Sequence, residues 1–172
     1  MKQMIVILSI ERRKDLALKT FESLLDCGVP KEKIKIIYGY DKLNYPEIKP
    51  FHLVPKALFE LIIPQTIGDI FYVECGTKFK ENPLNIEIDK QKINWLGYVR
   101  ILKNYIVGAK CIYLPRIILE DLKNIKKYTH IDKMIMNYGI KNNNLLVSEN
   151  SIVNFYKYES DFNTKKNKKN IV

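Results

Sequence analysis

The order of apolar and polar residues over the first part of the chain predicts a strand, a helix and a second strand. Met4–Ile10 is an almost continuous apolar run rich in β-branched side chains, which is typical of a strand buried on both faces. Apolar residues recur with helical spacing over Lys14–Cys27, and Gly28 follows as a natural C-terminal stop. Lys33–Asp41 predicts the second strand. A βαβ unit of this kind places its two strands parallel in one sheet.

The rest of the chain continues this α/β pattern. A third, central strand is predicted at Asp69–Glu74, and Gly97 and Gly108 lie inside later predicted strands, where glycine marks a bulge or a close backbone approach. The remaining predicted elements are helices at Lys56–Ile63, Arg116–Lys127 and Ile131–Tyr138, the last stopping at Gly139, and strands at Trp95–Arg100, Tyr105–Tyr113, Leu145–Val147 and Ile152–Tyr158. We expect one Rossmann-like α/β domain over residues 1–160, with a mostly parallel central sheet flanked by helices, and a basic, disordered tail at 161–172.

The composition favours a folded, basic protein. The 172 residues are 47% hydrophobic and 28% charged, which excludes a chain that is disordered throughout. The formal net charge of +10 attracts polyanions such as nucleic acids, anionic lipid heads or nucleotide phosphates. Four lysines without an acid follow Thr164 (Lys165, Lys166, Lys168 and Lys169). We interpret this tail as a solvated segment, with a contact to a polyanion as the alternative.

Cysteine usage and hydropathy bear on location. Cys27, Cys75 and Cys111 are odd in number and form no CxxC pair, which indicates a reduced, cytoplasmic setting and argues against a disulfide scaffold or a structural zinc site. No run approaches the ~20 apolar residues that a membrane helix needs, so no transmembrane segment is expected. The first apolar run is short and is followed at once by charged residues, as in a strand and not a signal peptide.

The candidate binding residues are those that follow the predicted strands, because ligands of open α/β sheets bind outside the carboxyl ends of the strands. Ser9, Glu11, Arg12 and Arg13 follow the first strand. Adjacent arginines can hold phosphates, since guanidinium groups match phosphate oxygens and a helix N-terminus adds positive potential. The alternative is a pair of solvated surface arginines.

Two further acids lie at predicted element ends. After the second strand, Asp41 can accept hydrogen bonds from a ribose and Tyr38 can stack on a base, although the same residues also suit an ordinary turn. Asp132 precedes a predicted helix, where it can cap the helix or act as the base that deprotonates an acceptor hydroxyl.

The third strand ends in Glu74, with Gly76 two residues later. A carboxylate in this position can bind a hard cation, Mn²⁺ or Mg²⁺, that bridges two phosphates; the alternative is a satisfied polar strand end. Asp69, at the other end of the strand, lies roughly 16 Å away in an extended chain and is too far to share an ion.

The order of these pieces resembles a GT-A glycosyltransferase, closest to the lipopolysaccharide-type galactosyltransferases and their viral relatives. In that family a strand leads into "N-L-x-R-R-x-D-R", a second strand ends near Asp and Gly, a third ends in "L-E-D-D", a "G-x-x-x-Y" stretch follows, and "P-x-D" precedes a short helix. The similar segments here are Leu8–Leu16, Tyr38–Asp41, Tyr72–Gly76, Gly108–Arg116 and Thr129–Lys133, within residues 4–155.

The resemblance implies a nucleotide sugar bound across the first three strand ends, with Glu74 and Asp132 as catalytic residues and Glu74 as the metal ligand. The residues it implies for nucleotide-sugar binding are Ser9, Glu11, Arg12, Arg13, Tyr38, Asp41 and Gly76. The family's acidic motif supplies several metal carboxylates, but only Glu74 matches here, because Cys75 and Gly76 do not replace carboxylates around a hard cation. Basic residues such as Arg12, Arg13 or Arg100 can then pair with the diphosphate directly.

Three functions remain open. The first is a glycosyltransferase that moves a sugar from a nucleotide-sugar donor to a glycan, lipid or nucleic-acid acceptor. The second is a catalytically degenerate glycosyltransferase-like binding or structural module, and one variant of this hypothesis gives the module a viral origin. The third is a basic nucleic-acid-binding protein, although no RRM, KH or zinc-finger pattern occurs. The sequence also lacks GxGxxG, GxxxxGK[ST], HExxH and GxSxG, so dehydrogenase, P-loop, zinc-protease and α/β-hydrolase functions have no carrier residues.

Overall fold

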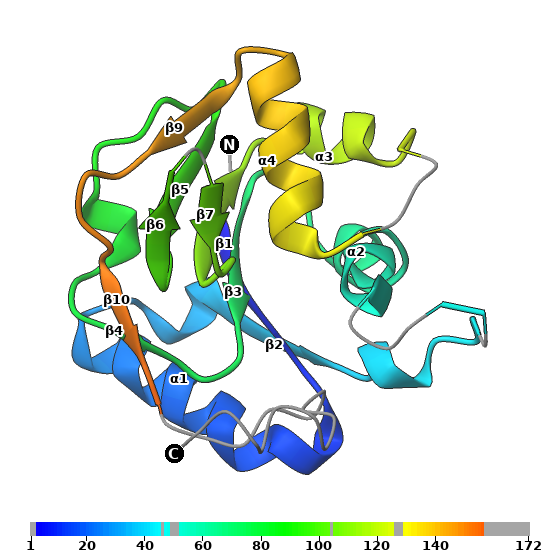
Figure 1. Ribbon diagram of the computed structural model, residues 1–172. Coiled ribbons are helices and arrows are strands. Elements are labelled where there is room, and N and C mark those ends of the chain that lie inside the picture. The colour runs from blue at the N-terminus through cyan, green and yellow to red at the C-terminus, as the bar shows by residue number, and fades with distance from the viewer. Residues whose placement is uncertain (1–2, 46, 49–51, 104, 126–128, 157–172) are drawn as a thin grey trace, which may run out of the picture.

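A computed structural model describes residues 3–45, 47–48, 52–103, 105–125 and 129–156 (Figure 1). The predicted tail at 161–172 lies outside these residues. The helix predicted over Arg116–Lys127 ends earlier, at Leu122, and the strand predicted over Ile152–Tyr158 spans only Val153–Phe155. Six strands form the central sheet: β1 (Met4–Ser9), β2 (Ile34–Tyr38), β3 (Ile70–Glu74), β5 (Ile93–Gly97), β8 (Cys111–Leu114) and β9 (Leu145–Val147). Their order is β2-β1-β3-β8-β5-β9. Only β8 runs antiparallel to its neighbours, so the sheet is mostly parallel, as predicted.

Helices cover both faces of this sheet (Figure 1). They are α1 (Lys14–Asp26) on one face, and on the other α2 (Leu53–Ala57), which continues as the π-helical turn η5 (Leu58–Ile62), α3 (Arg116–Leu122) and α4 (Ile131–Lys141). The alternation of side chains along β1 explains the two layers. Ile5 and Ile7 pack in the same core as Leu24 of α1, whereas Val6 and Leu8 belong to the core beneath the other helices. A strand covered on both faces needs the continuous apolar run that the sequence has.

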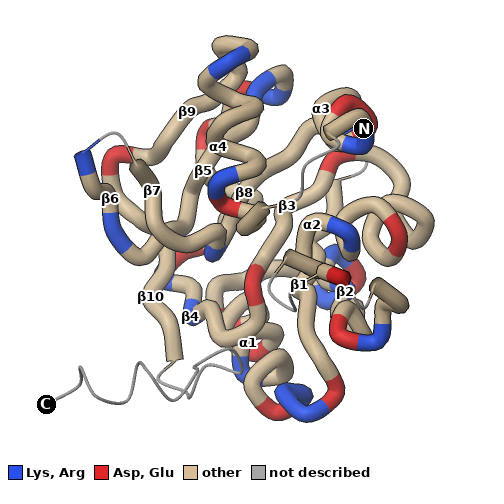
Figure 2. Tube along the Cα trace, turned by 45° about the vertical axis from the view of Figure 1, so that its right-hand side comes forward, with Lys and Arg blue, Asp and Glu red and all other residues tan. Residues whose placement is uncertain are grey.

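Short elements connect these layers. The short helical turns are η1 (Glu11–Arg13), η2 (Lys31–Lys33), η3 (Tyr40–Lys42), η6 (Ile63–Gln65) and η7 (Pro83–Asn85). The short strands are β4 (Thr77–Phe79) paired with β10 (Val153–Phe155), and β6 (Arg100–Leu102) paired with β7 (Tyr105–Val107). Among the described residues, no helix has both the length and the apolar character to cross a bilayer. Lys and Arg are interleaved with Asp and Glu along the helices and loops, and the central strands are largely uncharged (Figure 2).

Two predicted strands are wrong in extent because each is broken near a glycine. Trp95–Arg100 is split into the end of β5 and the start of β6, and Tyr105–Tyr113 is split into β7 and β8. At Gly97 the pairing with β8 shifts register, and a Cβ there would lie 2.8 Å from Cγ2 of Val153. Gly108 has φ of +92°, a left-handed conformation that turns the chain out of β7. Both glycines therefore mark the bulge and the close approach expected of them.

The helix predicted to stop at Gly139 instead continues to Lys141. Gly139 is needed for packing, since a Cβ there would lie 2.8 Å from the Cβ of Leu145 on β9. A glycine that reads locally as a helix stop can thus be a contact point between a helix and a strand. The long-range contact outweighs the local preference, which costs only about 1 kcal/mol in a helix interior.

Candidate functional site

The carboxyl ends of β1, β2 and β3 lie side by side at one edge of the sheet. Ser9 is the register partner of Tyr38 in β2, and Leu8 is the partner of Glu74 in β3. Beyond the ladder, the N–H of Gly39 donates to the carbonyl of Ser9 at 3.1 Å. Parallel pairing therefore brings together the strand ends that sequence reasoning selected, and we refer to this region as the open edge.

The turn η1 places the candidate residues of the first strand end around the other two. Glu11 and Arg12 are exposed, whereas Arg13 is partly buried. Burial and the charge of Glu11 raise the pKa of the Tyr38 hydroxyl. Burial raises the pKa of the Cys75 thiol, while a hydrogen bond with Ser9 and the charge of Arg13 act in the opposite direction. The charge of Glu11 thus affects Tyr38 at the end of β2, and the charge of Arg13 affects Cys75 just after β3.

The residues after β2 divide between the interior and the surface. Gly39 has φ of +96° and leads into η3, in which Tyr40 is buried and Asp41 is exposed. Tyr40 contributes to raising the pKa of the Tyr72 hydroxyl, so it lies close to Tyr72 on β3. Asp41 lies on the outer side of the same turn.

Glu74 at the end of β3 forms an ion pair with Lys110. The distance from Nζ of Lys110 to Oε1 of Glu74 is 3.1 Å, and the side chains are 9% and 38% exposed, respectively. Because β8 is antiparallel to β3, its first end meets the last end of β3, and the N–H of Glu74 donates to the carbonyl of Lys110 at 3.3 Å. Sequence reasoning missed Lys110 as a site residue. The signal that marks it is a single lysine within the apolar stretch Tyr105–Tyr113.

Asp132, in the first turn of α4, lies close enough to Tyr72 and Tyr105 to act on their hydroxyls. The pKa of the buried Tyr72 hydroxyl is raised well above its ordinary value, first by burial and then by charges that include Glu74 and Asp132. The pKa of Tyr105 is raised by burial, by the charge of Asp132 and by a hydrogen bond to it. The charges of the two predicted catalytic acids, Glu74 and Asp132, therefore both raise the pKa of Tyr72, although the acids are far apart in sequence.

Asp132 is not the N-cap residue of α4, so the capping alternative considered for it is wrong. His130 is the N-cap residue of α4 and its side chain makes no capping hydrogen bond. Asp132 lies in the first turn, where its Oδ1 accepts the N–H of Lys133 at 2.8 Å and its charge suits the helix dipole. The rings of His130 and His52 pack in a T-shaped arrangement, with centroids 5.1 Å apart.

The residues at the end of β3 do not fit the hard cation that the GT-A resemblance implies. Cys75 is buried and burial raises its thiol pKa, which favours a neutral thiol over an ionised ligand. Gly76 has no side chain, and its N–H donates to Oγ1 of Thr20 at 3.0 Å. Within the part of the chain that the structure describes, no group of three or more His, Cys, Asp or Glu residues can hold a metal ion. Glu74 alone, paired with a lysine, is a poor donor set for Mn²⁺ or Mg²⁺.

The fold is similar to that of a glycosyltransferase. The crystal structure of a glycosyltransferase involved in the glycosylation of the major capsid of PBCV-1 matches with a TM-score of 0.51, covering 84% of this chain and 82% of that chain. The sequence identity is 14%, so the likeness shows a glycosyltransferase-like α/β fold and no more. No protein-family profile and no curated protein sequence matches this chain.

Proposed function

We propose that this protein is a GT-A-type glycosyltransferase that binds a nucleotide sugar at the open edge and transfers the sugar to a hydroxyl group of an acceptor. The observation that carries the proposal is the meeting of three parallel strand ends with Arg13, Lys110 and Asp132 at one edge of a glycosyltransferase-like sheet. Ligands of open α/β sheets bind at such carboxyl ends, and cations there suit a diphosphate.

Most of the candidate residues have a role in nucleotide-sugar binding in this scheme. The cations Arg13 and Lys110 bind the diphosphate, with Arg12 at the more exposed end of the same turn. Tyr38 stacks on the base and Asp41 accepts hydrogen bonds from the ribose. Ser9 and Gly76 form the floor of the site, because both are buried and hydrogen-bonded within the protein.

The transfer step requires a base and a stabilised leaving group. Asp132 takes the proton from the acceptor hydroxyl, and that oxygen forms a bond to the anomeric carbon of the sugar. The bond from this carbon to the diphosphate breaks, and the nucleoside diphosphate leaves with the electron pair. The hydroxyl of Tyr105 lies beside Asp132, and the cations at the open edge stabilise the charge on the leaving group.

The test compares Asp132→Asn with Asp121→Asn. Each aspartate raises the pKa of a neighbouring tyrosine, Tyr105 for Asp132 and Tyr138 for Asp121, but Asp121 is exposed on α3. A panel of UDP, GDP and CMP sugars is first screened by thermal shift, and sugar release is then measured with the stabilising donor. We expect Asp132→Asn to bind the donor and to lose about 100-fold or more in turnover, and Asp121→Asn to keep both.

Three other outcomes decide between the functions. A donor-dependent thermal shift without turnover in the wild type identifies a degenerate binding module. Salt-sensitive DNA binding without any nucleotide effect identifies a nucleic-acid-binding protein. Equal turnover in both variants removes Asp132 from the mechanism.

A further inference from the structure

We propose that Glu74 holds Lys110 in position until the donor arrives, and that Lys110 then neutralises the donor diphosphate in the place of a divalent cation. This inference rests on the proposed function of the open edge. It starts from the mismatch described above between the residues after β3 and the ligands that a hard cation needs.

The backbone fixes where the lysine lies. Lys110 immediately precedes β8, and its carbonyl accepts the N–H of Glu74 while its own N–H donates to the carbonyl of Gly97 at 3.1 Å. The oxygen of Lys110 is also 3.4 Å from the hydroxyl of Thr77. A residue anchored to β3, β4 and β5 in this way cannot move its backbone away from the open edge without breaking the sheet.

Burial of the two partners is unequal, and this inequality suggests an exchange. Lys110 is 9% exposed and Glu74 is 38% exposed, so the carboxylate is the partner with access to solvent. A buried ammonium needs an anionic partner, because an unpaired charge in the interior is costly. Glu74 can turn outward into water at little cost, and a phosphate oxygen can then take its place. Before the donor binds, the Glu74 carboxylate thus pairs with the Lys110 ammonium. A diphosphate oxygen forms the same ion pair once the donor is bound.

A second cationic side chain, Arg13, lies near the end of β3. The charges of Arg13 and Lys110 both lower the pKa of Cys75, which lies next to Glu74, although burial outweighs them. Two positive side chains therefore flank the end of β3 from different elements, η1 and the start of β8. A diphosphate carries several negative charges, and two cations at one strand end match it in the way that one bridging metal ion would.

The exchange makes a prediction opposite to that of a metal site. If Glu74 were a metal ligand, its neutralisation would remove cation-dependent binding. If Glu74 competes with the phosphate for Lys110, Glu74→Gln removes a competing anion, and diphosphate binding is retained or strengthened. Lys110→Met removes the cation itself and weakens binding.

The experiment is isothermal titration of UDP and GDP into the full chain, in EDTA and then with added Mn²⁺. We expect saturable binding in EDTA, a loss of about tenfold or more in Lys110→Met, and a smaller loss in Lys110→Arg, which keeps the charge. Glu74→Gln binds at least as tightly as the wild type. The matched control is Lys123→Met, which removes a lysine paired with Glu120 on α3 and leaves binding unchanged.

Binding that requires Mn²⁺ and is lost in Glu74→Gln overturns the inference and leaves the proposed function intact. Absence of binding to either nucleotide, with and without Mn²⁺, counts against the proposed function and the inference with it. Circular dichroism melts show whether Lys110→Met is folded; if it is not, the EDTA arm, Lys110→Arg and Glu74→Gln decide the question.

Discussion

The two ends of the β3–β8 pair carry similar chemistry in different surroundings. At the open edge, Glu74 pairs with Lys110 and remains 38% exposed. At the opposite end, Asp69 is 2% exposed, and its two oxygens accept the hydroxyl of Tyr113 at 2.8 Å and the N–H of Arg116 at 2.9 Å. The comparison teaches that an acid at a strand end is structural when buried donors satisfy both of its oxygens. It is available for ligands when part of it remains in solvent.

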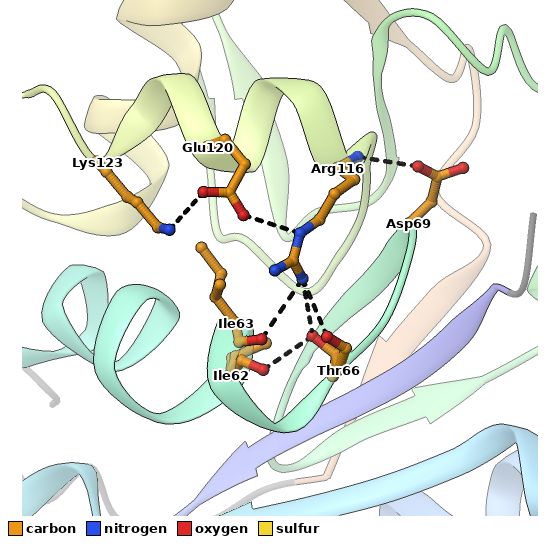
Figure 3. Close-up of polar contacts among 7 residues, drawn as sticks. All are labelled: Ile62, Ile63, Thr66, Asp69, Arg116, Glu120 and Lys123. Carbon is orange, nitrogen blue, oxygen red and sulfur yellow. Dashed lines mark hydrogen bonds and ion pairs between the residues drawn. The ribbon is translucent and has the colours of Figure 1, made fainter.

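We call this opposite end, around Asp69, the closed end. The side chain of Arg116 adds further polar contacts there (Figure 3). Its Nε contacts Oε1 of Glu120 at 2.9 Å, and its Nη1 donates to the carbonyl of Thr66 at 3.1 Å. Glu120 in turn pairs with Lys123. These contacts join α3 to the segment that leads into β3, so the network positions secondary structure and leaves its acids engaged within the protein.

The largest expected effect is at the closed end. Asp69→Ala removes the acceptor of a buried hydroxyl and of a backbone N–H, and we expect the free energy of unfolding to fall by about 3 kcal/mol. Urea unfolding monitored by circular dichroism measures this change. Asp121→Ala, on an exposed part of α3, is the control and should change stability far less. A fall no larger than that of the control would show that the closed end is not structural.

A smaller effect at the same end separates the hydroxyl from the carboxylate. Tyr113→Phe keeps the ring in the core but removes its hydrogen bond to Asp69, and we expect a loss of about 2 kcal/mol. Tyr105→Phe removes the hydroxyl beside Asp132 and should cost less, because Tyr105 is only partly buried. Equal losses in the two variants would contradict the distinction between the ends.

At the open edge, Glu74→Gln should lower stability by about 1 kcal/mol, because the carboxylate is partly in water but the substitution puts a neutral amide in place of the charged partner of the buried Lys110. The same urea titration measures it, with Asp69→Asn as the buried counterpart. A loss at Glu74 as large as that at Asp69 would mean that the Glu74–Lys110 pair is a structural element and not a partner available to a ligand.

Alkaline pH provides the mildest comparison. Burial and Asp69 raise the pKa of Tyr113, and burial and Asp132 raise that of Tyr105, so both hydroxyls keep their protons in the fold when unfolded tyrosines ionise near pH 10. Their contribution to stability is complete below that pH and is lost as the pH rises through and above it. We expect Tyr113→Phe to flatten this loss more than Tyr105→Phe, as measured by urea unfolding at increasing pH. A greater flattening in Tyr105→Phe would reverse the assignment of the two ends.

Much of the fold follows from local patterns. The apolar run at Met4–Ile10, the helical spacing after Lys14 and the run at Asp69–Glu74 correspond to β1, α1 and β3 nearly to the residue. Periodicity determines these elements because the two strands are buried on both faces and read as continuous apolar runs, whereas the helix is buried on one face and repeats its apolar residues with helical spacing. The meeting of Ser9, Tyr38 and Glu74 also follows, since parallel strands linked by a helix end at the same edge of their sheet.

The partners of those strand ends do not follow from local patterns. Lys110 reaches Glu74 because β8 is antiparallel to β3, and the docking of α4 on the sheet brings Asp132 close enough to Tyr72 for its charge to act there. The continuation of α4 through Gly139 likewise depends on its contact with Leu145. Pairing direction and helix docking are set by burial shared between distant segments. The residues that flank a position in the sequence therefore do not determine which charged side chain contacts it in the folded protein.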